Sequence, residues 1–126
     1  MIRKNLFTIL VSAGIFYLSM ANSDTFEPVK LFTIPYFDKI VHFGMYFILM
    51  FTVLIEHRKN ISGKRQIFAA AIFPLIYGIL IEILQSFTIS RSASFFDALA
   101  DFAGIAVAIV AWNIFQKSRN KSFRLQ

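Results

Sequence analysis

The stretch that decides the fold is residues 67–87, which read IFAAAIFPLIYGILIEILQSF. A helix rises about 1.5 Å per residue, so this stretch would cover about 30 Å, close to the hydrocarbon thickness of a bilayer. Glu82 and Gln85 are its most polar residues, and both come near its end. The stretch therefore predicts a transmembrane helix with polar groups toward one membrane face.

The rest of the chain has the same character. Hydrophobic residues make up 57% of the 126 residues and charged residues 16%, against about 45–50% and about 25% in soluble domains. A soluble fold of this size could not hide so much apolar surface. Because the apolar runs lack the alternation of barrel strands, helices are the structure that satisfies their backbone in lipid. We predict a single-domain, all-α integral membrane protein with four transmembrane helices, at about 6–21, 38–55, 67–87 and 96–115, and a tail at 116–126.

The basic residues predict the orientation. They gather before the first span, between the second and third spans and in the tail, whereas Lys30, Lys39 and Arg91 fall on the other side. Loops rich in Lys and Arg stay in the cytoplasm, so both termini are expected there. Anchoring to anionic lipid headgroups explains the net charge of +6 without a nucleic-acid partner. The chain has no cysteine, which excludes disulfides and thiolate metal sites.

The first span has a second interpretation. Arg3 and Lys4 precede an apolar run that ends in Ser19, Met20 and Ala21, a pattern typical of a signal peptide with a small-residue cleavage site. Cleavage there would leave three spans. The polar residues discussed below all follow that point.

A set of polar residues lies where the second, third and fourth spans approach the predicted outer face. A charged side chain in a helix at the bilayer centre costs about 2.5–3.5 kcal/mol, so such residues are expected to face one another. We predict that they line one ligand-binding pocket near that face, with Arg91 able to clamp a phosphate or carboxylate. The residues are Asp38, Lys39, His42, Tyr46, Glu82, Gln85, Arg91, Ser94, Asp97 and Asp101.

Helical spacing supports a shared pocket. Asp38, His42 and Tyr46 are spaced i, i+4, i+8 and so lie on one helix face. Glu82 and Gln85 are spaced i, i+3. In the fourth span two acids and two small residues follow one stripe, and small residues permit close helix packing in lipid. That stripe is Asp97, Asp101, Gly104 and Ala108.

Simpler interpretations exist for several of these residues. Asp38 is also a suitable N-cap, because a carboxylate stabilises the positive end of a helix dipole. Tyr46 could be a core aromatic residue. The whole set could hold the helices together, although interhelical hydrogen bonds in membranes contribute only about 0.6 kcal/mol each.

The charges in this set do not balance. If all are ionised, the set contains four acids and two bases, which leaves two excess negative charges before His42 is counted. Such an excess in a low-dielectric pocket is unfavourable, so we expect His42 to be protonated or Glu82 and Asp101 to share a proton. His42, Glu82 and Asp101 are therefore the candidate catalytic residues. Neither a cofactor nor a metal is expected, because His42 with Glu82, Asp97 or Asp101 lacks tight ligand spacing such as His-x-x-x-His.

The order of these residues resembles the VanZ-like family, which is named after a small membrane protein linked to teicoplanin resistance. The resemblance runs from residue 38 to residue 104. This family usually has Asn where the chain has Asp101, and often a second Gly where it has Ala108. The resemblance implies a multi-pass protein of the bacterial cytoplasmic membrane but names no reaction. It is carried by Asp38-Lys39-Ile40-Val41-His42-Phe43 with Tyr46, by Glu82-Ile83-Leu84-Gln85, and by Arg91, Ser94, Asp97 and Gly104.

Three functions remain open. The first is a non-enzymatic envelope protein that binds a lipid headgroup or amphiphile and affects glycopeptide susceptibility. The second is an intramembrane enzyme that uses His42 and a carboxyl group as acid and base on a lipid-linked envelope precursor. The third is a proton-coupled transporter, which four short helices without broken-helix repeats do not favour unless the protein oligomerises.

Overall fold

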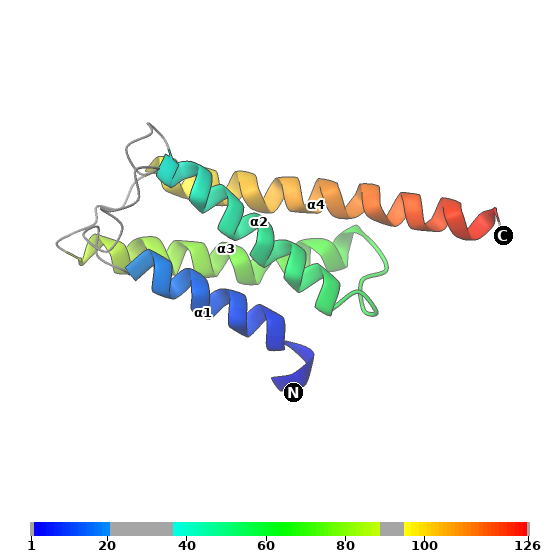
Figure 1. The fold of residues 1–126 in the computed structure, drawn as a ribbon, viewed down its shortest axis with the longest axis horizontal. Coiled ribbons are helices and arrows are strands. Elements are labelled where there is room, and N and C mark those ends of the chain that lie inside the picture. The colour runs from blue at the N-terminus through cyan, green and yellow to red at the C-terminus, as the bar shows by residue number, and fades with distance from the viewer. Residues whose placement is uncertain (1, 21–36, 89–94, 126) are drawn as a thin grey trace.

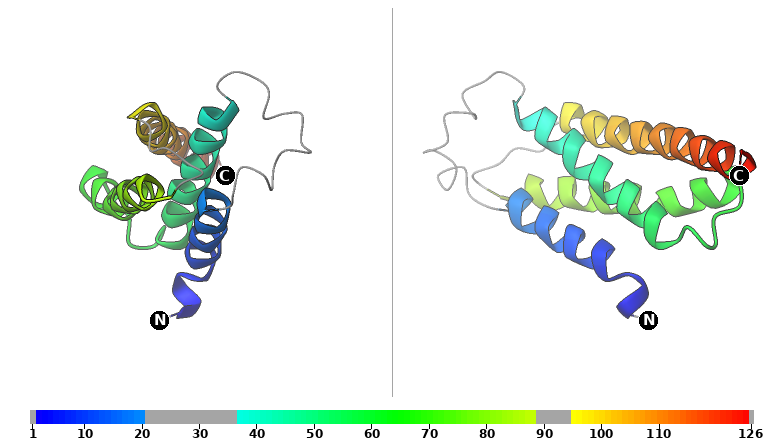
Figure 2. Two further views of the ribbon diagram at one scale, coloured as in Figure 1. Left: turned by 90° about the vertical axis from the view of Figure 1, so that its left-hand side faces the viewer. Right: turned by 45° about the vertical axis from the view of Figure 1, so that its right-hand side comes forward.

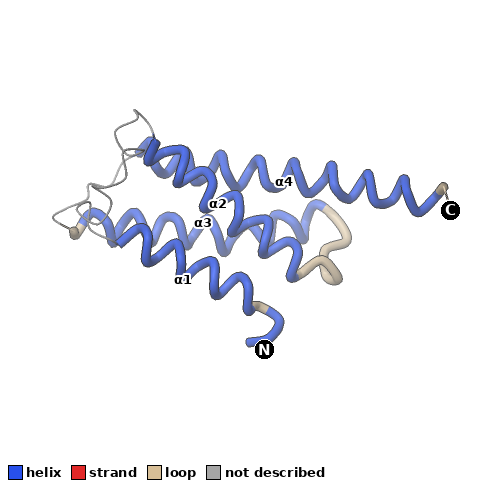
Figure 3. The backbone as a smooth tube through the Cα atoms, viewed as in Figure 1, coloured by secondary structure: helices blue, strands red, loops and turns tan. Residues whose placement is uncertain are grey.

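The computed structural model describes residues 2–20, 37–88 and 95–125, and these ranges contain helices and no strand. The helices are connected in the order α1 to α4 (Figures 1 and 3). A 3-10 turn, Ile2–Lys4, precedes α1. The α-helices are α1 (Leu6–Met20), α2 (Phe37–Glu56), α3 (Lys64–Ser86) and α4 (Phe95–Arg124).

The helices alternate in direction along the bundle. The first helix begins and the last helix ends at the same end, where α2 also connects to α3 (Figure 1). Helix α2 lies between α1 and α4, with α3 beside them (Figure 2). The most extensive contact is between α2 and α4. Both α2 and α4 therefore bring their first turns to the end opposite the N-terminus of α1.

Three helices, α2, α3 and α4, are long and apolar enough to cross a membrane, whereas α1 has 15 residues and is shorter than a full span. The prediction of an all-helical membrane protein is confirmed at this level. The count of four spans stays a prediction. The helices extend beyond the expected spans mainly at the basic end, since α3 begins at Lys64 and α4 continues to Arg124.

Apolar side chains cover the outside of the bundle as well as its core. Leu49, Met50 and Leu54 of α2 are fully buried, and Trp112 of α4 packs in the same core. Large apolar residues on the outer surface are more than half exposed, among them Phe7, Phe68, Ile72, Val110 and Ile114. A water-soluble protein rarely presents apolar surface on this scale. Such a surface suits acyl chains.

Gly104 sets the distance between α2 and α4. A methyl group at this position would overlap the carbonyl oxygen of Phe43 and would lie 3.0 Å from the amide nitrogen of Phe47. Both are backbone atoms of a helix, so they cannot move aside cheaply. The absence of a side chain lets α4 pack directly on the backbone of α2, beside His42.

Helix α1 is attached by polar contacts instead. The Glu56 carboxylate, at the end of α2, accepts hydrogen bonds from the amides of Phe7 and Thr8 at 2.7 and 3.1 Å. The Tyr77 hydroxyl donates to the Ser12 carbonyl at 2.5 Å. The first turn of any helix has free amides, which favour a carboxylate at that position. Cleavage of the first span as a signal peptide would remove these contacts.

Candidate functional site

The centre of the site is a buried pair between α2 and α4. His42 Nδ1 lies 3.0 Å from Asp101 Oδ1, within hydrogen-bonding distance. The two side chains are only 4% and 6% exposed. His42 comes five residues after the start of α2 and Asp101 six after the start of α4, so each lies about 8–9 Å along its helix. The equal depth follows from the common end at which the two helices begin.

Glu82 of α3 adds a third group to this pair. One potential ligand atom from each of His42, Glu82 and Asp101 lies within 4.8 Å of the other two. Glu82 stands four residues before the end of α3 at Ser86, which brings it to the same layer, because α3 runs in the opposite direction. Three helices thus supply one imidazole and two carboxyl groups to one small volume.

Tyr46 and Gly78 close the inner side of this layer. Tyr46 is fully buried, and its hydroxyl has no hydrogen-bond partner in the described part of the chain. A methyl group at Gly78 would lie 3.2 Å from Tyr46 Cε1 and 3.5 Å from Asp101 Oδ2. The phenol ring of Tyr46 and the Asp101 carboxylate therefore both lie against the backbone of α3 at Gly78. Gly78 also borders a cavity of about 10 Å³ beside Asp101, room for about one water molecule.

An ionic layer lies outside the buried group. Lys39 Nζ lies 3.1 Å from Asp38 Oδ2 and 3.4 Å from Asp97 Oδ1. Asp97 is in the first turn of α4 and largely buried, while Asp38 is half exposed. Lys39 therefore joins the starts of α2 and α4. This layer separates the buried His42–Asp101 pair from the end of the bundle.

The predicted site residues divide into three groups. The structure brings together His42, Tyr46, Glu82 and Asp101, with Asp38, Lys39 and Asp97 above them. Gln85 is buried but points to α1, where its Nε2 donates to the Ser19 carbonyl at 3.0 Å. Arg91 and Ser94 lie outside the described residues.

Gly78 is a site residue that the sequence did not assign to the pocket. It lies four residues before Glu82, on the same face of α3. This spacing is a signal that would have placed it beside the acid. A side chain there would meet Tyr46, so the glycine makes room for the inner side of the site.

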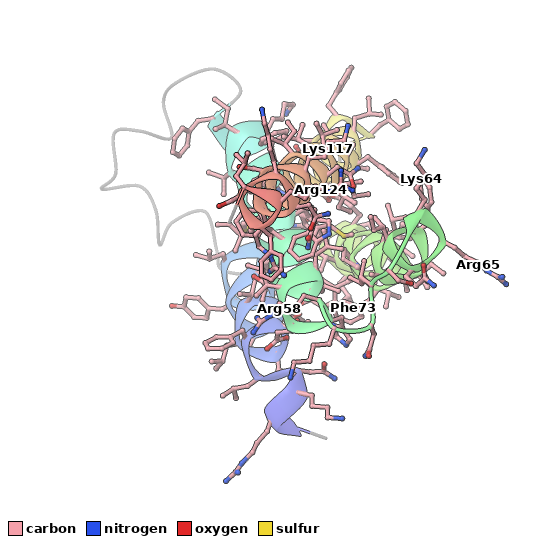
Figure 4. All side chains as sticks on the ribbon, turned by 90° about the vertical axis from the view of Figure 1, so that its right-hand side faces the viewer. Arg58, Lys64, Arg65, Phe73, Lys117 and Arg124 are labelled. Atoms are coloured by element: carbon pink, nitrogen blue, oxygen red, sulfur yellow. The ribbon has the colours of Figure 1, made fainter. Side chains whose placement is uncertain are left out.

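The opposite end of the bundle has a different character. A cavity of about 520 Å³ opens there between α1, α2 and α3, and a second one of about 330 Å³ lies beside the start of α3 and the second half of α4. Uncharged polar groups such as Asn5, Gln66 and Asn113 share their walls with apolar side chains. Basic side chains surround this end, including Arg58, Lys64, Arg65, Lys117 and Arg124 (Figure 4).

Together, the apolar outer surface, the three span-length helices and the buried polar layer define a small helical membrane protein with a polar centre toward one end. The sequence model of the VanZ/LLP1 family matches residues 3–116, nearly the whole chain, so the chain belongs to this family. No curated protein and no solved structure gives a significant match. The predicted family is therefore confirmed.

Proposed function

We propose that this protein binds the polar headgroup of a lipid or another amphiphile through the His42–Glu82–Asp101 layer and the Lys39 ion pairs above it. The protein would act as a non-enzymatic accessory of the bacterial envelope and influence glycopeptide susceptibility. In this proposal four helices cross the cytoplasmic membrane, both termini are cytoplasmic, and the polar layer lies near the extracytoplasmic face.

The observation that carries the proposal is the meeting of His42, Glu82 and Asp101 from three different helices. Each of these residues is costly in lipid, so their placement in one layer needs a reason beyond helix packing. Their convergence supports recognition of a polar group at a defined depth. Lys39 supplies a cation on the outer side of this layer, only 28% exposed and shared by two carboxylates.

The charge distribution supports the proposed orientation. At the opposite end of the bundle, the start of α3 and the last part of α4 are exposed and basic, which suits the anionic cytoplasmic leaflet. The basic residues there are Lys64, Arg65, Lys117 and Arg124. The acids Asp38, Glu82, Asp97 and Asp101 all lie toward the other end. An amphiphile in the outer leaflet would reach the Lys39 layer first.

A second function, acid–base catalysis on a lipid-linked precursor, is favoured by one observation. The His42 imidazole is positioned by Asp101 at 3.0 Å and has Glu82 next to it. An imidazole oriented by a carboxylate, with another carboxyl group nearby, is a competent acid–base arrangement. A covalent change in the bound amphiphile would distinguish this function from binding alone.

Photolabelling tests the proposal. Protein in vesicles that contain phosphatidylglycerol with a diazirine in its headgroup is irradiated, and labelled peptides are identified by mass spectrometry. Wild-type protein is expected to label near the start of α2 or α4. His42→Gln and Lys39→Gln are each expected to reduce that label at least 10-fold, because each removes a group that is proposed to contact the headgroup.

His57→Gln is the matched control. His57 also lies on the α2 side of the bundle, but at the opposite end, with its Nδ1 3.0 Å from the Val53 carbonyl. Its replacement is expected to leave labelling at the starts of α2 and α4 unchanged. Equal labelling in all variants, or labelling confined to the basic end, would refute binding at the polar layer.

A further inference from the structure

We infer that His42, Glu82 and Asp101 form a binding site for a divalent transition-metal ion, with Zn²⁺ the first candidate. This inference deepens the proposed function and rests on it only for the role of the ion as receptor for the headgroup. Metal binding itself stands on the geometry of these three side chains. Ligand spacing along the chain does not predict this site, because its three residues come from three different helices.

Two of the three ligand atoms already have the separation of neighbouring metal ligands, and the third lies close to both. Zn²⁺ binds imidazole nitrogen and carboxylate oxygen at about 2.0–2.2 Å, which places neighbouring ligands about 3.0–3.4 Å apart. His42 Nδ1 and Asp101 Oδ1 are already 3.0 Å apart. Glu82 offers an oxygen within 4.8 Å of both, so a side-chain movement of about 1–2 Å would complete a three-ligand face.

The chemistry of the set is selective. One imidazole with two carboxylates suits Zn²⁺, Mn²⁺ or Fe²⁺ better than Ca²⁺, which prefers oxygen ligands alone. Three protein ligands leave at least one coordination position for water or for an anionic oxygen. A divalent ion would also cancel the charge of two ionised carboxylates in surroundings that oppose an unbalanced charge.

Tyr46 provides an independent observation. Its side chain is fully buried, and its hydroxyl is without a partner among the described residues. A methyl group at Gly78 would contact both the phenol ring of Tyr46 and the Asp101 carboxylate, so the two groups lie on the same side of α3. A buried hydroxyl without a partner costs about 1–3 kcal/mol, so it is expected to have one in the working protein. Water bound to the metal ion would supply that partner.

The ion would give the proposed headgroup site a defined receptor. Phosphate or carboxylate oxygen could replace the bound water, while Lys39 lies above the layer as a second positive group. The site is thus suited to an anionic oxygen ligand presented from the end of the bundle where α2 and α4 begin. The headgroup test and the metal test have separate readouts, so either can fail alone.

Metal titration tests the inference directly. Detergent-purified protein is treated with a chelator, dialysed and titrated with Co²⁺, whose visible spectrum reports the number and type of ligands. Zn²⁺ competition and elemental analysis give affinity and stoichiometry. We expect one ion per chain, with a dissociation constant in the micromolar range or below. No saturable binding to folded wild-type protein would overturn the inference.

Three substitutions identify the ligands. His42→Gln, Glu82→Gln and Asp101→Asn are each expected to weaken binding at least 10-fold, whereas His57→Gln should bind as wild type does. A loss in His57→Gln, or full binding in the three ligand variants, would assign the metal to another site.

A fourth variant guards against misfolding. Asp101→His replaces one ligand with another and removes a carboxylate that a purely structural His–Asp pair requires. We expect it to keep one Co²⁺ per chain with an absorption spectrum shifted by the additional nitrogen ligand. Binding lost in folded Asp101→His protein, as judged by circular dichroism, would contradict the proposed role of this position.

Discussion

Charged side chains are placed differently at the two ends of this bundle. At the end where α2 and α4 begin, charged side chains turn inward and pair across helices, as Lys39 does with Asp97 and His42 with Asp101. At the other end basic side chains surround the bundle, and neutral polar groups share the walls of larger cavities with apolar side chains. The first arrangement costs desolvation and needs defined partners, whereas the second costs little. Function is therefore expected at the first end.

The helix contacts differ in the same way. Near the polar layer, Gly104 lets α4 pack directly on the backbone of α2, so the two helices are held at a fixed distance. At the basic end, α1 is attached by the Glu56 carboxylate and by side chains that can adjust. Close backbone packing fixes the positions of His42 and Asp101, and such fixed geometry is what a binding site requires.

The largest effect is expected from Gly104→Ala. Its methyl group would overlap the Phe43 backbone, and overpacking of this kind costs about 1–3 kcal/mol. Unfolding in mixed micelles, followed by fluorescence of the single tryptophan Trp112, measures the loss. Gly44→Ala is the matched control, because nothing lies within 4 Å of its added methyl group. Equal stability of the two variants would show that the α2–α4 contact is not tight.

Glu56→Ala should have the next largest effect, and only on α1. Glu56 accepts hydrogen bonds from two amides and from the Thr8 hydroxyl. Hydrogen bonds to a charged group contribute about 1.5–3 kcal/mol when well formed, and exposure to solvent at the bundle end reduces this to about 1 kcal/mol. Protease accessibility of residues 6–20 is expected to increase while Co²⁺ binding is retained. Glu56→Gln should show an intermediate effect, since an amide oxygen accepts less strongly than a carboxylate.

The polar layer could be predicted from the sequence because charged side chains are costly in lipid and are therefore expected to face one another inside the bundle. His42, Glu82 and Asp101 were grouped from their positions near the ends of the spans and from their charges, and the antiparallel helices bring them to one layer. Gln85 was grouped by the same logic but points to Ser19 of α1, since spacing places a residue on a face without saying which neighbour that face meets. The role of Glu56 was not predicted either, because it depends on which helix begins beside the end of α2.

Tyr46→Phe distinguishes a core aromatic from a site residue. If the buried hydroxyl has no partner, its removal should leave stability unchanged or raise it by up to about 1 kcal/mol. With Zn²⁺ or Co²⁺ bound, we expect the reverse: a loss of about 1 kcal/mol and an altered Co²⁺ spectrum. Unfolding is therefore measured with and without the ion. The same change in stability under both conditions would place the hydroxyl outside the metal site.

The smallest change in stability is expected from Lys39→Gln. Its ion pairs are partly exposed, and such pairs contribute about 0.2–1 kcal/mol. Unfolding should therefore shift by about 0.5 kcal/mol or less, and the shift should shrink further in high salt. Photolabelling by the anionic headgroup probe should nevertheless fall sharply, because the approaching phosphate loses its first cation. A large loss of stability together with unchanged labelling would mean that Lys39 only holds the starts of α2 and α4 together, and the inward charges at this end would then be structural.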